Sequence, residues 1–117
     1  MIQFSRLDHV TQMVPIGKKE EAKTFYKEVL LLEEIPGNHP RGAIWFNIGN
    51  IQLHIVEEEP GPVSGRHPAF EVKDLEEAKA YLESKGIEIS YSSVIEGRSR
   101  CFFRDPFSNR IELLEYI

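Results

Sequence analysis

Four side chains that can bind a metal ion recur at matching places in this sequence of 117 residues. The imidazoles of His9 and His67 lie 58 positions apart, and the same spacing separates His54 from the carboxylate of Glu112. Neutral imidazoles and a carboxylate suit Zn, Ni, Fe(II), Mn or Co. Such a metal polarises a substrate oxygen or generates a nucleophile, and on Fe(II) the same ligands also make an oxygenase site. The alternative is that these are polar strand residues that face solvent.

The helices that must position these side chains also repeat. Residues 18–32 and 74–86 each carry an apolar stripe at helical spacing, and the similar sequences AKTFY and AKAYL lie 56 positions apart. Asp74 is expected to cap the second helix, and Gly86 is expected to end it.

Short alternating runs rich in β-branched and aromatic residues predict strands around both helices. They cover residues 7–14, 42–49 and 50–58, and then 65–72, 99–106 and 109–117. The chain therefore reads as two strand–helix–strand–strand–strand repeats, 1–59 and 66–117, connected by a Pro/Gly-rich joint at 60–65. Because neither repeat is long enough to bury a convincing core alone, we expect one α+β domain over 1–117. Its sheet would be curved, mixed and eight-stranded, with the helices outside.

The alternation of side chains along a strand predicts which of them share a face. Ile51, Leu53 and Ile55 should pack on the helices, so His54 points the other way. The same parity places all four candidate ligands on the face away from the helices, around a concave site. It adds candidate substrate-binding residues to that face: Trp45, Asn47, Gln52, Arg98 and Arg100.

The arginines suggest an anionic substrate, because a guanidinium binds carboxylate or phosphate through two parallel hydrogen bonds. Arg98 and Arg100 are the candidates, with pairing to glutamates as the alternative, whereas Arg104 and Arg110 flank a turn and are expected to be structural. His39 is interpreted as a surface loop residue and Cys101 as a small core residue.

Composition excludes several classes of protein. The 14 basic and 19 acidic side chains give a net charge of −5, which argues against nucleic acid as a partner. No run approaches the ~20 apolar residues of a membrane span, and the first residues do not resemble a signal peptide. A single cysteine favours a reducing compartment, so we expect a cytoplasmic protein.

The sequence resembles the vicinal oxygen chelate superfamily, which includes glyoxalase I, bleomycin-resistance proteins and dioxygenases. The matching pieces are LDHV, FYKEVLLLEE, HPAFEVKDLEEA and GRSRCFFRDPFSNRIELLE. The resemblance implies paired βαβββ modules, usually dimeric, with a divalent metal held at His9, His54, His67 and Glu112, where Glu112 can also move a proton. Two glycines usual in the family are replaced by Leu31 and Ser108, so Asn109 is expected to take the left-handed conformation in the last turn.

The expected function is therefore a metal-dependent, homodimeric enzyme that acts on a small, oxygenated, anionic metabolite by lyase or isomerase chemistry. Ring-cleaving dioxygenation and thiol transfer are less favoured chemistries. The alternatives are a non-catalytic protein that sequesters a small molecule, and a subunit whose site is completed by a partner.

Overall fold

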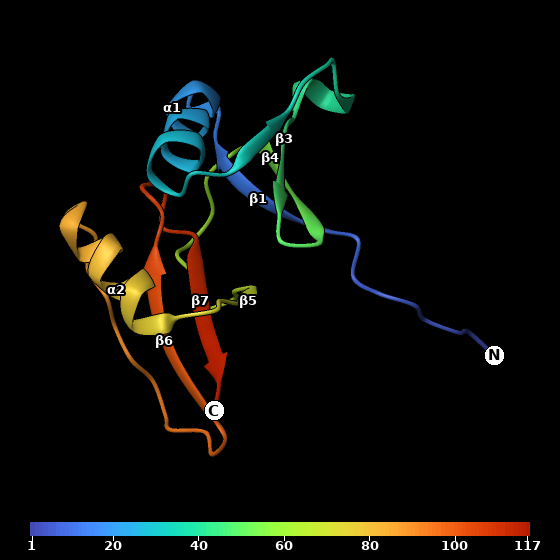
Figure 1. The fold of residues 1–117 in the computed structure, drawn as a ribbon. Helices are drawn as coiled ribbons and strands as arrows, with labels where there is room; N and C mark the ends of the chain where they lie inside the picture. The colour runs from blue at the N-terminus through green and yellow to red at the C-terminus, as the bar shows by residue number, and fades with distance from the viewer. The chain divides into compact units, whose positions relative to one another are not determined.

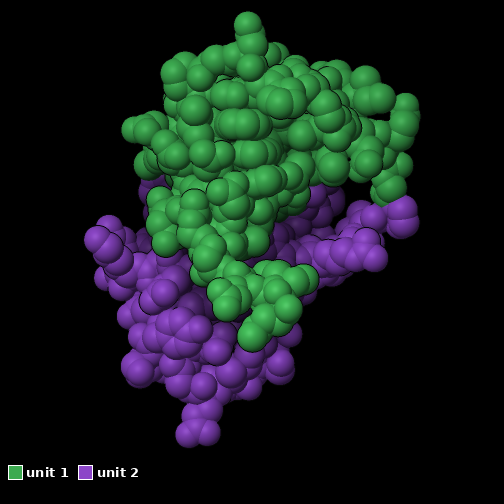
Figure 2. Space-filling model, turned by 90° about the vertical axis from the view of Figure 1, so that its right-hand side faces the viewer, with its two compact units in different colours: residues 1–61 green, residues 62–117 purple.

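The computed structural model describes every residue from Met1 to Ile117 and divides into two compact units (Figure 2). Unit 1 covers Met1–Gly61 and unit 2 covers Pro62–Ile117, so the division falls inside the expected joint at 60–65. That the two repeats form one domain stays a prediction.

Unit 1 is a four-stranded mixed sheet in the order β1-β4-β3-β2 (Figure 1). β1 pairs with β4 in parallel, and the other neighbours are antiparallel. Its elements are β1 (His9–Pro15), α1 (Lys19–Thr24), a π-helical turn (Phe25–Val29), β2 (Glu33–Ile35), a 3-10 turn (Pro40–Gly42), β3 (Ile44–Ile48) and β4 (Ile51–Glu58).

The core of unit 1 lies between α1 and the sheet, as the alternation predicted. Leu53 and Ile55 of β4 are buried there, and the ring of Tyr26 lies 6.1 Å from that of Phe46 on β3. Gln12 is buried on the same face of β1 with its side-chain nitrogen unpaired. Burial of these apolar side chains leaves the opposite face of the sheet to His54 and its neighbours.

Unit 2 repeats this topology with one strand fewer, in the order β5-β7-β6. β5 and β7 are parallel, and β6 and β7 are antiparallel. Its elements are β5 (Ala69–Glu71), α2 (Leu75–Ser84), β6 (Arg98–Arg104) and β7 (Arg110–Tyr116). Asp74 caps α2 by accepting a hydrogen bond of 3.0 Å from the backbone N–H of Glu77, and Gly86 follows with φ +76°, which confirms both expected ends.

The expected eight-stranded sheet is wrong: the structure has seven strands in two sheets. The counterpart of β2 in unit 2 is reduced to one bridge, in which Ser90 and Phe102 exchange two backbone hydrogen bonds. Beyond that bridge, the guanidinium of Arg100 donates to the carbonyl oxygen of Ser93 at 2.6 Å. A side chain thus occupies a backbone acceptor that a continuous strand would use.

Two non-glycine residues carry the left-handed turns where glycine was expected from the resemblance. Leu31 ends the first helical segment at φ +61°, and Ser108 takes φ +71° in the β6–β7 turn. The expectation that Asn109 would take this conformation is therefore wrong. Its backbone N–H and side-chain amide instead donate to the carboxylate of Asp105, at 2.9 and 2.8 Å.

Candidate functional site

Unit 1 stacks four rings on the face of its sheet away from α1. Strand register places Trp45 opposite His54, and His9 enters β1 beside Gln52. Ring centroids are 4.1 Å apart between His9 and His54, between His54 and Trp45, and between Trp45 and His39. We call this the ring stack (His9, His54, Trp45, His39). It brings together the two candidate ligands of unit 1.

Hydrogen bonds determine which ring nitrogen of each histidine in this pair is available. His9 Nδ1 lies 2.9 Å from Asp8 Oδ2, and His54 Nε2 lies 2.9 Å from Gln52 Oε1. Because these partners are acceptors, each of these nitrogens carries a proton, which leaves His9 Nε2 and His54 Nδ1 with free lone pairs. The two rings are nearly parallel, at 17°, so their in-plane lone pairs do not converge in this arrangement.

Burial lowers the pKa of His54 below its usual value, and the neighbouring charge of His9 lowers it further. His54 is 8% exposed. The hydrogen bond to His9 lowers the pKa of Asp8, which lies at the surface. Burial therefore favours the neutral imidazole, the form that binds metals, at the most buried ring of the stack.

Unit 2 brings together the other two candidate ligands. His67 precedes β5 rather than lying within it, and its Nε2 is 3.0 Å from Oε1 of Glu112 on β7. Its Nδ1 is 2.8 Å from the carbonyl oxygen of Gly65, a distance that requires a proton on Nδ1. With the proton on Nδ1, the Nε2 atom of His67 faces the carboxylate, an arrangement that suits a shared proton or a cation bound by both groups.

Glu112 is held in place by a second contact. It is 5% exposed, and Nη1 of Arg100 lies 3.4 Å from the same Oε1 atom. Arg100 also donates to Ser93, as described above, whereas its Nε is buried without a hydrogen-bond partner. The guanidinium of Arg100 thus has partners in both Glu112 and Ser93, and its role as a substrate contact stays a prediction.

Arg98 differs from Arg100 because its guanidinium has no hydrogen-bond partner. Its Nε is buried and unpaired, and its Cζ lies 4.9 Å from the ring centroid of Tyr116. A guanidinium held over an aromatic ring with its donors unused is suited to bind an anionic group.

The other candidate substrate contacts have partners within unit 1. Trp45 is covered on both faces by His39 and His54. Asn47 donates to Glu33 Oε1 at 2.9 Å, which ties β3 to β2, and Gln52 supports His54. Cys101 is fully buried, and burial raises its thiol pKa, as expected for a core residue.

Sequence reasoning missed His39, which it assigned to the surface. His39 stacks on Trp45, and its Nε2 lies 2.8 Å from the carbonyl oxygen of Ile35. No pattern in the sequence predicts this, because the loop that carries His39 reaches Trp45 only through the β2–β3 connection. The structure contains no cluster of three or more metal-binding side chains.

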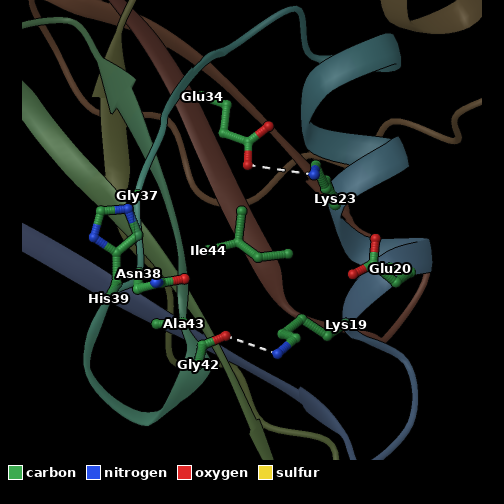
Figure 3. A pocket seen from close by; sticks show the side chains of 10 residues that line it. All are labelled: Lys19, Glu20, Lys23, Glu34, Gly37, Asn38, His39, Gly42, Ala43 and Ile44. Atoms are coloured by element: carbon green, nitrogen blue, oxygen red, sulfur yellow. Dashed lines mark hydrogen bonds and ion pairs between the residues drawn. The ribbon is translucent and has the colours of Figure 1, made fainter.

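A pocket of about 320 Å³ lies on unit 1 between α1 and the β2–β3 connection (Figure 3). Within it, Lys23 pairs with Glu34 at 3.4 Å and Lys19 donates to the carbonyl oxygen of Gly42 at 2.7 Å (Figure 3). His39 is the only member of the ring stack that lines it. Lys19, Lys23 and Glu34 thus already have partners within unit 1.

Comparison with known proteins identifies the family. No helix in the chain is long and apolar enough to cross a membrane. Among curated proteins, none matches the sequence. A putative glyoxalase family protein from Bacillus anthracis is 38% identical, covers 100% of this chain and 99% of its own, and superposes with a TM-score of 0.89.

More distant structures share the fold. Lactoylglutathione lyase from Agrobacterium tumefaciens is 21% identical over 97% of this chain and 95% of its own, with a TM-score of 0.77. TnmS3, an antibiotic binding protein from Streptomyces sp. CB03234, is 19% identical over the whole of both chains, with a TM-score of 0.79. The family model described as Glyoxalase/Bleomycin resistance protein/Dioxygenase superfamily matches residues 6–113. The chain therefore belongs to this superfamily.

Proposed function

We propose that this protein is a metal-dependent enzyme of the lyase or isomerase type, acting on a small, oxygenated, anionic metabolite. The observation that carries the proposal is the pair His67 and Glu112. The carbonyl oxygen of Gly65 fixes the proton on Nδ1 of His67, and Nε2 faces the carboxylate at 3.0 Å. A metal-binding histidine commonly has this arrangement, with its other nitrogen donating to an oxygen.

The proposed ligands are the four residues expected from the sequence, His9, His54, His67 and Glu112. The fixed protons on the three histidines fit a divalent ion, which supports this set, with Zn, Ni, Fe, Mn and Co as candidates. When bound, such an ion supplies Lewis-acid polarisation of substrate oxygens.

The protein's own groups have separate roles in this proposal. Oε1 of Glu112 is engaged by His67 and Arg100, which leaves Oε2 to accept a proton from substrate carbon. Arg98 binds the anionic group, because its donors are free. The remaining proposed substrate contacts are Trp45, Asn47 and Gln52. A substrate would bind them in place of the side chains that they contact in this structure.

Metal content tests the proposal. Protein purified without chelators is expected to contain close to one transition metal ion per chain, as measured by mass spectrometry. His67→Ala and Glu112→Gln should lose it, while the matched controls His39→Ala and Glu71→Gln should keep it. Unchanged metal content in both site variants would overturn the ligand assignment.

Arg98→Met tests the substrate class. With a carboxylate-bearing substrate it should raise KM at least tenfold, since a charge-assisted hydrogen bond is lost, and leave the metal content unchanged. Arg41→Met removes the same charge from an exposed loop and serves as the control. An equal effect of both variants would show that Arg98 makes no specific contact.

The second candidate function is sequestration of a small molecule without chemistry. The stacked arrangement of His9 and His54 favours it, because parallel rings do not direct their lone pairs to one point. The absence of metal uptake with any of the candidate ions would favour this function, and ligand-binding screens would then replace activity assays.

A further inference from the structure

Two arginines of unit 2 hold the end of the joint against the β6–β7 turn. Arg104, on β6, donates through Nη1 to the carbonyl oxygens of Ser64 at 3.1 Å and Ser108 at 2.7 Å. Arg110, its cross-strand neighbour on β7, donates through Nη1 to the carbonyl oxygen of Gly65 at 3.3 Å. Adjacent carbonyls of the joint are thus bound by adjacent side chains of the sheet.

The carbonyl of Gly65 has two donors, because Nδ1 of His67 also binds it at 2.8 Å. Nη1 of Arg110 and Nδ1 of His67 are 3.5 Å apart, a separation that follows from two donors meeting at one oxygen. Both donors also contact Phe102. The guanidinium carbon of Arg110 lies 4.0 Å from the centre of that ring, and His67 meets it edge-on at 5.2 Å.

We propose that Arg110 is a positioning residue for His67. The Arg110 guanidinium lies on the Phe102 ring and binds the Gly65 carbonyl oxygen, which fixes the position of that oxygen. Nδ1 of His67 donates to the same oxygen, and this hydrogen bond turns Nε2 toward Glu112. The effect of Arg110 on the orientation of His67 does not depend on the proposed function, whereas its effect on metal affinity rests on that function.

The chemistry of arginine suits this task better than that of lysine. The planar guanidinium lies flat over Phe102 while an edge N–H donates to Gly65, and an ammonium cannot do both. The same contacts argue against Arg110 as an anchor for an anionic substrate, since its face and one of its donors are already used.

The test compares three variants. Arg110→Met keeps an unbranched apolar side chain over Phe102 but removes the donors, and Arg110→Lys keeps a charge and a donor. Arg66→Met is the matched control, because Arg66 adjoins His67 and its exposed side chain makes no hydrogen bond. Backbone amide NMR spectra establish that each variant is folded.

The first measurement is the ring N–H signal of His67 in the metal-free protein. We expect an Nδ1 proton protected from exchange in the wild type and in Arg66→Met. It should be lost in Arg110→Met and partly retained in Arg110→Lys. Retention of this protected proton in Arg110→Met would overturn the positioning role.

The second measurement is titration with Zn²⁺ alone. Arg110→Met should lower the affinity 10- to 100-fold, as removal of groups that orient metal ligands commonly does, while Arg66→Met should leave it unchanged. If the wild type binds neither Zn²⁺ nor any other of the candidate ions but Arg110→Met still loses the ring proton, the positioning role stands and the proposed function fails. Equal Zn²⁺ affinity in the wild type and Arg110→Met would overturn the inferred effect on the metal.

Discussion

The two units carry their candidate ligands at equivalent positions of the repeat and yet support them by different means. In unit 1, His9 and His54 stack on each other and on Trp45, each ring 4.1 Å from the next. In unit 2, His67 and Glu112 face each other at 3.0 Å over the ring of Phe102.

The difference goes together with a change of residue type at the last-strand position of the repeat. At the last-strand position, unit 1 has an imidazole, which stacks on its neighbours, whereas unit 2 has a carboxylate, which attracts His67 and Arg100. In unit 2 the ring of Phe102 meets His67 edge-on, and Phe102 is the cross-strand neighbour of Glu112. Unit 1 is supported by the rings themselves. Repetition of the topology thus does not imply repetition of the contacts.

The largest expected effect is on Phe102. Because it is 1% exposed and lies beneath both His67 and Arg110, Phe102→Ala should lower the free energy of unfolding by about 3–4 kcal/mol. Trp45→Ala should cost less, since Trp45 is only partly buried. Urea unfolding followed by circular dichroism measures both. Phe102→Leu, which keeps most of the apolar volume, is the control and should cost about 1 kcal/mol. A larger loss for Trp45→Ala would reverse the comparison.

The next largest effect is expected on metal affinity, which should depend more on the His67–Glu112 pair than on the His9–His54 pair. His67→Ala is expected to weaken Zn²⁺ binding by about 100-fold and His54→Ala by about tenfold. The reason is that His67 already faces its partner ligand, whereas the free nitrogen of His54 belongs to a stacked ring. Calorimetric titration measures both affinities. Equal losses would mean that the ring stack opens at no cost.

The sequence predicted the elements and the faces but not the supporting contacts. Side-chain alternation placed Leu53 in the core and His54 opposite it, because a strand facing a helix must bury alternate residues. It could not predict the loss of the eighth strand, since the contact of Arg100 with Ser93 is not encoded in the alternation of side chains along a strand.

The positions of Arg110 and His39 were beyond sequence reasoning for the same reason. Each contacts a residue that is distant in sequence or carried by an irregular loop: Gly65 for Arg110 and Trp45 for His39. The candidate ligands could be picked out from the sequence because they repeat at a fixed spacing, and their assignment as a metal site stays a prediction. The structure brings each pair together within its own unit.

A smaller effect is expected on the pH dependence of stability, to which the buried His54 of unit 1 contributes. Burial lowers the pKa of His54 in the folded state from its ordinary value of 6.5, so the unfolded chain binds a proton first as the pH falls. In metal-free protein, stability should be constant with respect to His54 above pH 6.5. Below that value it should fall by at most about 1.4 kcal/mol per pH unit until His54 itself is protonated in the folded state.

Urea unfolding between pH 5 and 8, in the presence of a chelator, measures this slope. His54→Gln should lose the part of the slope that His54 contributes, because glutamine does not titrate. His39→Gln serves as the control for removal of a histidine from the same ring stack. An unchanged slope in His54→Gln would show that burial of His54 contributes nothing to the pH dependence.

The smallest expected effect tests a feature that the units share. Leu31 in unit 1 and Ser108 in unit 2 both hold left-handed backbone, at φ +61° and +71°. That conformation costs an L-residue about 1–2 kcal/mol, whereas glycine adopts it freely but loses about 0.5–1 kcal/mol of chain entropy on folding. Leu31→Gly and Ser108→Gly should therefore each raise the free energy of unfolding by about 0.5–1 kcal/mol. The Leu31 side chain is mostly exposed, so its removal deletes little packing. Gly86→Ala, at φ +76° with open space at the Cβ position, should lower stability by a similar amount.

If Leu31→Gly and Ser108→Gly lowered stability, side-chain contacts and not backbone strain would decide these turns. The two units would then differ in their turns as they do in their sites.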